Sequence, residues 1–109
     1  MATQFAGNLT TSSSINTPLS IAALLLAAGY TGSSGLVELI IEPTGSGNLV
    51  ISSDSAIATE AAGFTLAPTL TFPTLVMRGS QQSPIQSAAL YLLSNTASKT
   101  FSIIVTSVA

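Results

Sequence analysis

The chain has 109 residues, of which 47% are apolar and only 6% are charged, against about 25% charged residues in an average protein. Two basic and four acidic residues cannot form the clustered positive surface that nucleic acids or an anionic membrane would bind. Cysteine and histidine are absent, which excludes disulfides, thiolate chemistry, the common zinc and iron sites and the familiar catalytic triads.

The first sixteen residues, 1–16, are polar and rich in serine and threonine, and they predict an extended arm outside the folded domain. Their large apolar side chains, Phe5, Leu9 and Ile15, are spaced too widely to form a core face. Such an arm is either a free terminus or a segment whose Phe5 and Leu9 dock on a neighbouring subunit. The remaining residues, 17–109, suit one domain with a modest core.

The next segment, 17–29, carries helix signals at both ends. Thr17 can cap the N-terminus, Pro18 suits the first helical position, and Gly29 suits the left-handed position that ends a helix. The alanines and leucines between them favour a helix, but they leave no polar face, so the helix would be buried all round. We expect a short helix or helical turn, with a strand as the alternative.

Two apolar runs around a glycine-rich turn follow. Residues 36–42 have apolar side chains at the odd positions, while Glu38 and Glu42 indicate that the other face is partly solvated. Residues 43–47 contain the turn formers proline and glycine, and residues 48–52 return with an apolar centre, Leu49–Ile51. This pattern predicts a β-hairpin.

Three shorter runs come next. Residues 64–68 and 69–72 predict short strands that are broken or ended by proline, which places them at sheet edges or bends. Residues 75–78 predict another short strand. Residues 54–63 are expected to be a loop, with one helical turn as an alternative, and residues 79–84 are expected to be an exposed polar loop.

The last part of the chain contains the two strongest apolar runs, at 87–94 and 100–108, joined by the polar connector 95–99. The short connector predicts a second β-hairpin. Both runs are apolar at nearly every position, so they are expected to be buried on both faces or covered by a partner chain. Together the predicted elements are typical of a mainly all-β, antiparallel, single-domain β-sandwich or jelly roll.

The few carboxylates do not form a chemical motif. Glu38 and Glu42 are predicted on the same strand face about 13 Å apart, too far for the paired carboxylates of glycoside cleavage. Asp54 and Glu60 could contribute to a calcium site, but their spacing matches no known calcium loop. We therefore predict a protein that is not an enzyme and that has no catalytic residue, cofactor or metal.

The shortage of charge indicates a surface that is partly covered by other protein chains, since free soluble domains usually carry many more charges. Neutral apolar strands are typical of obligate subunit interfaces, which resemble a core cut in half. The candidate interface residues are Phe5, Leu9, Leu90, Leu92, Ile103 and Val105.

The order of several short segments resembles small structural virion proteins of tailed bacteriophages, which present an N-L-V-I strand, a G-x-x-L-x-P turn and a closing L-Y-L…T-F-x-I-x-V pair of strands. These segments are Gly47–Ile51, Gly63–Pro68, Leu70–Phe72, Ala89–Leu93 and Phe101–Val105. Residues 19–29 are not part of the pattern, and the low charge count departs from it.

The resemblance implies a β-sandwich or jelly-roll module that decorates or cements a capsid, commonly as a homotrimer. Its partners would be the major capsid protein or other virion proteins, and its place would be the capsid surface rather than the tail. The alternative function is a tail, spike or adhesin-type module that recognises a receptor or glycan. Such a module would need an exposed aromatic cluster, but the chain has only Tyr30, Tyr91 and four phenylalanines, most of them in predicted strands. An exposed pocket formed by Tyr30 and the loop 79–84 would favour this alternative.

Overall fold

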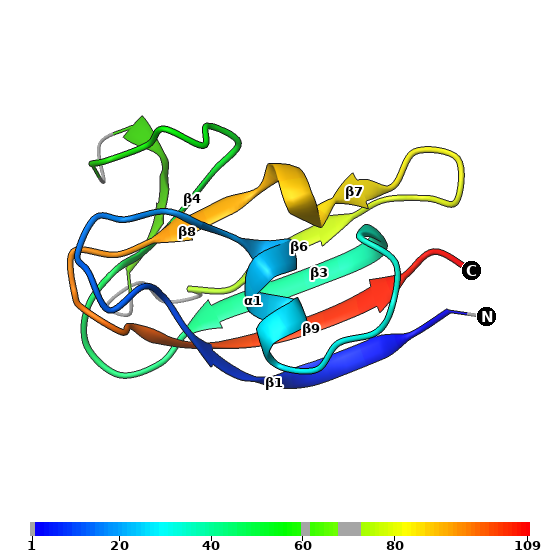
Figure 1. Cartoon of the computed structure of the whole chain (residues 1–109), viewed down its shortest axis with the longest axis horizontal. Helices are drawn as coiled ribbons and strands as arrows, with labels where there is room; N and C mark the ends of the chain where they lie inside the picture. The colour runs from blue at the N-terminus through cyan, green and yellow to red at the C-terminus, as the bar shows by residue number, and fades with distance from the viewer. Residues whose placement is uncertain (1, 60–61, 68–72) are drawn as a thin grey trace.

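A computed structural model describes residues 2–59, 62–67 and 73–109 of the chain. Two antiparallel sheets pack against each other, and one short helix lies beside them (Figure 1). The prediction of an all-β, sandwich-like single domain with one short helix is confirmed. The predicted strand at 69–72 lies outside the described residues.

The larger of the two sheets, called the large sheet below, contains five strands. In spatial order its strands are β1 (Gln4–Thr10), β9 (Thr100–Ser107), β3 (Gly35–Pro43) and β6 (Leu75–Arg78), and β7 (Ile85–Gln86) also pairs with the start of β3. Every second residue of β9 is buried, and every second residue of β1 is half-buried, with more exposed residues between them. This period of two places one face of the sheet toward the core and leaves the other toward solvent.

The small sheet contains four short strands. In spatial order they are β2 (Leu19–Ser20), β8 (Tyr91–Leu93), β4 (Leu49–Ser52) and β5 (Phe64–Leu66). A 3-10 turn at Ser87–Ala89, labelled η2, comes just before β8, so the strand predicted from residue 87 begins later than expected. The small sheet covers only part of the inner face of the large sheet, and the helix covers another part (Figure 1).

Helix α1 (Ile21–Ala27) confirms the helical alternative over the strand. Its N-cap is Ser20 and not Thr17, because the Ser20 hydroxyl accepts a hydrogen bond of 3.1 Å from the backbone N–H of Ala23. Gly29 ends the turn with φ +91°, as its position predicted. The helix is not buried all round, since Leu26 is 74% exposed.

The main core lies between the large sheet, the small sheet and α1. Its inner layer comes from alternate positions of β3 and β9, and its other layer from α1 and the small sheet. The largest fully buried members are Phe101, Ile21, Leu25, Leu36, Leu39, Ile41, Leu49, Leu92 and Ile103. A second, smaller cluster of Val50, Ile57 and Leu93 covers the outer face of the small sheet.

Both predicted hairpins are wrong in the same way. Strands β3 and β4 belong to different sheets, and so do β8 and β9, so each connector crosses from one sheet to the other. The connectors 44–48 and 94–99 run side by side, where Thr44 donates backbone and hydroxyl hydrogen bonds to the carbonyl of Thr100. A turn-rich connector between apolar runs fits either geometry, and pairing is decided by tertiary packing.

The extended segment at the N-terminus also differs from its prediction. Residues 4–10 form β1, which pairs with β9 of the same chain along its whole length. Phe5 and Leu9 point to the inner face and pack against the chain's own core instead of a neighbouring subunit. The physical reason is the period-two alternation of Phe5, Gly7 and Leu9, which is a strand pattern.

Candidate interaction surface

Three of the six candidate interface residues are inside the domain. Leu92 and Val105 are fully buried and Ile103 is 1% exposed, so none of them can contact a partner chain in this fold. The apolar runs that contain these residues were expected to be buried or covered by a partner chain. In the structure the opposite sheet of the same chain buries these three side chains. Leu90 is half-buried and lines an apolar hollow of about 330 Å³ beside the exposed ring of Phe64.

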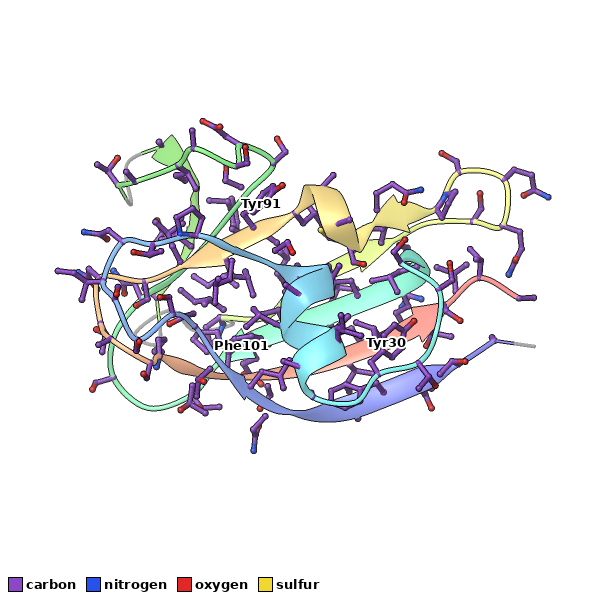
Figure 2. All side chains as sticks on the ribbon, viewed as in Figure 1. Tyr30, Tyr91 and Phe101 are labelled. Carbon is purple, nitrogen blue, oxygen red and sulfur yellow. The ribbon has the colours of Figure 1, made fainter. Side chains whose placement is uncertain are left out.

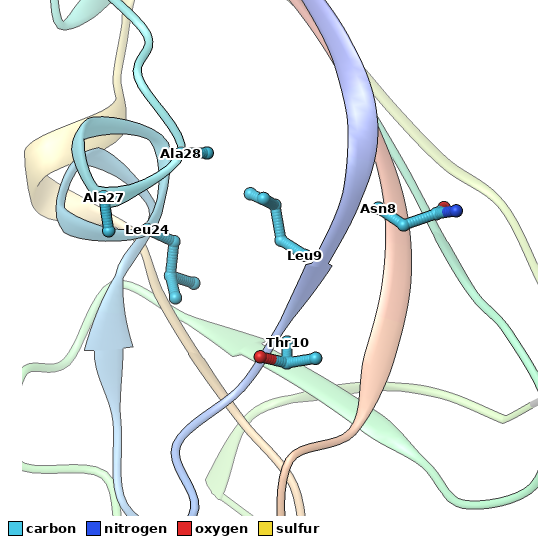
Figure 3. A pocket seen from close by; sticks show the side chains of 6 residues that line it. All are labelled: Asn8, Leu9, Thr10, Leu24, Ala27 and Ala28. Carbon is cyan, nitrogen blue, oxygen red and sulfur yellow. The ribbon is translucent and has the colours of Figure 1, made fainter.

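The other two candidates hold the N-terminal strand on the core. The ring of Phe5 packs edge-on against Tyr30, with centroids 6.4 Å apart and planes at 77°. Leu9 points toward α1, where it faces Leu24 across a hollow of about 240 Å³, whereas Asn8 points the other way (Figure 3). These contacts stabilise the domain itself.

The aromatic site expected for a receptor- or glycan-binding module does not form. Tyr30 is only 8% exposed, and its hydroxyl donates a hydrogen bond of 2.8 Å to the carbonyl of Ser33. Figure 2 shows Tyr30 and Phe101 within the body of the molecule. The hollow beside Tyr30 is lined by Ala22, Leu26, Gly32, Ser34 and Ser87, with no residue from the loop 79–84.

Charged side chains are sparse and dispersed. Arg78 and Glu38 form an ion pair of 3.0 Å between neighbouring strands β6 and β3. Glu42 lies on the same face as Glu38, as predicted, and Asp54 caps its own turn by accepting a hydrogen bond from the backbone of Ala56. Glu60, the second residue of the calcium hypothesis, lies outside the described residues.

Lys99 is the most unusual charged residue, because it is only 3% exposed. Its ammonium group donates hydrogen bonds to the backbone carbonyls of Thr44 and, at 2.7 Å, Ser46. Its own backbone N–H donates to the hydroxyl of Thr11. Burial lowers the pKa of Lys99 from its ordinary value of 10.5. Lys99 therefore joins the two crossing connectors from the inside and is not available to a ligand.

The outer face of the large sheet carries a feature that single-strand patterns did not reveal. Its side chains form three rows that run across the strands, and the strand register aligns them. The first row contains Gln4, Thr106, Glu38 and Arg78; the second contains Ala6, Ile104, Ile40 and Val76; the third contains Asn8, Ser102 and Glu42.

The middle row is apolar at all four positions and lies between two polar rows. Val76 is 49% and Ile104 is 37% exposed, and Ala6 is exposed as well. The flanking rows are ordered by the Arg78–Glu38 ion pair and by a hydrogen bond of 2.8 Å from the Ser102 hydroxyl to the side-chain carbonyl of Asn8. The sequence contained these residues, but only the register of four separate strands brings them into one row.

Comparison with protein-family models, with curated proteins and with solved structures gave no match. Within residues 2–59, 62–67 and 73–109, no helix is long and apolar enough to cross a bilayer. Over the same ranges, no three acidic side chains come together as a candidate metal site.

Proposed function

We propose that the protein is a non-enzymatic structural subunit of a virion that decorates or cements the capsid through contacts with other protein chains. The observation that carries the proposal is the character of the described surface. It bears four charged side chains, Glu38, Glu42, Asp54 and Arg78, because Lys99 is buried.

Large apolar side chains are exposed on several sides of the molecule. They are Ile15, Leu26, Phe64, Val76 and Ile104, with exposures from 37% to 74%. Single exposed apolar residues are ordinary on any protein. Here they occur on a surface with little charge to keep copies apart, which favours a protein that works surrounded by partners. The resemblance of the strand order to phage virion proteins supports the same class.

The test is to locate the chain in intact particles. Virions purified by density gradient from the source of the sequence are expected to contain many copies by quantitative mass spectrometry, and cryo-electron microscopy is expected to show this fold on the head surface. The major capsid protein in the same sample provides the reference copy number. Loss of the chain from virions during gradient purification would contradict the proposal.

The alternative, a receptor- or glycan-binding tip, receives no support from a specific contact. Of the aromatic residues that the structure describes, Phe64 is the one with a mostly exposed ring, at 59%. The hollow beside this single phenylalanine is mostly apolar, with Ser52 and Ser53 as the only polar residues among the described ones that line it, which is few hydrogen-bonding groups for recognising a sugar. Glycan-array binding above background would nevertheless favour this alternative over a structural subunit.

A further inference from the structure

We propose that the outer face of the large sheet binds a second copy of this chain, face to face, about a two-fold axis that runs parallel to the strands between β9 and β3. The inference rests on the proposed function only in so far as it identifies one of the contacts that a structural subunit would make. The occupant follows from the pattern of the three rows, which is complementary to itself.

Under this symmetry the apolar row of one copy lies over the apolar row of the other, with the order of the strands reversed. Strand β9 of one copy lies over β3 of the other, and β1 lies over β6, because the axis passes between the two central strands. Ile104 then faces the partner copy's Ile40, and Ala6 faces the partner copy's Val76. Each contact occurs twice, as in any isologous interface.

The polar rows are also compatible with this axis. Glu38 faces the hydroxyl of Thr106 in the second copy. Glu42 faces Ser102, whose hydroxyl would donate to the partner's carboxylate in place of Asn8 Oδ1. Arg78, the single cation on the described part of this face, faces the neutral side chain of the partner copy's Gln4. A two-fold axis along the rows would instead place Glu38 directly against Glu42, and like charges in an interface are strongly unfavourable. The charge pattern therefore selects the axis parallel to the strands.

The area of the face indicates a weak dimer. Strands β1, β9, β3 and β6 contain seven, eight, nine and four residues. At about 3.3 Å per residue and about 4.8 Å between strands they give about 440 Å² per copy, or about 900 Å² in total. This is slightly below the roughly 1,000 Å² that a specific protein interface usually buries. Two twisted sheets also pack best at about −30°, which concentrates the contact on the central strands and on Ile104 and Ile40.

The contact is expected to form in solution at high protein concentration and to be favoured further where many copies are held side by side on a shell. Its two-fold symmetry differs from the trimer that the family resemblance implies. The two expectations predict different masses, so one experiment distinguishes them.

The test measures mass against concentration by sedimentation equilibrium. The wild-type chain is expected to rise from 11.0 kDa toward twice that mass as the concentration increases. Ile40→Lys and Ile104→Glu should each weaken association by about tenfold or more, since each buries a charge against the partner's apolar row. Lys at position 40 lies between Glu38 and Glu42, which favours retention of the fold.

The matched control is Leu26→Lys, which changes a more exposed apolar residue on α1 and should leave dimerisation unaltered. Mixing the Ile40→Lys and Ile104→Glu chains should restore a heterodimer, because positions 40 and 104 face each other across the axis. Circular dichroism of each variant verifies that it is folded.

A wild-type chain that stays monomeric, a trimer, loss of association in Leu26→Lys alone, or a mixture that remains monomeric would each overturn the inference. The outcome is separate from that of the proposed function. A monomer in solution that is nevertheless present in many copies on virions leaves the function intact, and a dimer that is absent from virions contradicts the function alone.

Discussion

The two sheets differ in what covers their outer faces. On the small sheet the outward side chains Val50 and Leu93 are fully buried beneath Ile57, which comes from the loop after β4. On the large sheet the outward apolar row includes Ile104, which is 37% exposed. Both sheets contain apolar runs, so such a run is buried on its outer face only where a further segment of the chain lies over it.

Truncation of a side chain on each outer face should change the free energy of unfolding by very different amounts. Leu93→Ala should lower the free energy of unfolding by about 2–5 kcal/mol, because it opens a cavity among packed side chains. Ile104→Ala should change it by about 0.5 kcal/mol or less, since the side chain contacts solvent. Urea denaturation at low protein concentration, where any dimer has dissociated, measures both. Equal losses in the two variants would contradict the contrast.

A second prediction concerns the segment that covers the small sheet. A methyl group on Gly63 would lie 2.5 Å from Val50 Cγ1 and 2.9 Å from Ile57 Cδ1, so Gly63→Ala must displace the covering cluster. We expect a loss of about 1–3 kcal/mol in the free energy of unfolding, as for other overpacked cores. Gly7→Ala in β1 is the matched control, because its nearest contact would be a phenylalanine ring atom at 3.3 Å.

A third prediction tests the connection between the two sheets. Lys99→Met leaves the carbonyls of Thr44 and Ser46 without their donor and should cost about 1–3 kcal/mol near neutral pH. The matched substitution Lys99→Arg keeps a charged hydrogen-bond donor but replaces the compact ammonium group with a planar guanidinium group. Thermal melting of both variants against the wild type measures the loss, and an unchanged melting temperature in Lys99→Met would show that the ammonium group does not hold the connectors.

The pH dependence of the same residue has a definite sign. Because burial lowers the pKa of Lys99 in the folded chain, the folded state releases this proton at a lower pH than the unfolded state does. Between the lowered pKa and 10.5 the unfolded state binds more protons, so the free energy of unfolding rises with pH in that window. The stability of the wild type relative to Lys99→Met should therefore increase toward pH 10.5.

Much of the fold could be predicted from local patterns. The strand at 75–78 and the helix after Pro18 follow from short-range signals, and so does the turn at Gly29. The pairing of the strands could not be predicted in this way. Whether a turn such as 43–47 makes a hairpin or crosses between sheets depends on which distant strand pairs with each neighbour.

The candidate surface was harder to predict than the fold. Ile103 and Val105 were proposed as interface residues because they are apolar and in a strand, whereas the structure buries them and exposes their neighbour Ile104. The choice between the two faces of β9 is made by α1 and the small sheet, which pack on one face only. The apolar row is formed by one residue from each of four strands, so it depends on the strand register and cannot be recognised in the sequence of any one strand.

A last prediction concerns the N-cap of the helix that covers part of the inner face of the large sheet. Ser20→Ala removes the side-chain acceptor for the N–H of Ala23 and should cost about 1 kcal/mol, the usual value of an N-cap. Thr17→Ala, at the position that the sequence favoured as the cap, should cost less, because the Thr17 hydroxyl donates only to the carbonyl of Ile15 in an exposed turn. Paired thermal melts decide between the two residues: a larger loss in Thr17→Ala would mean that the helix begins before β2 and that the small sheet lacks its first strand.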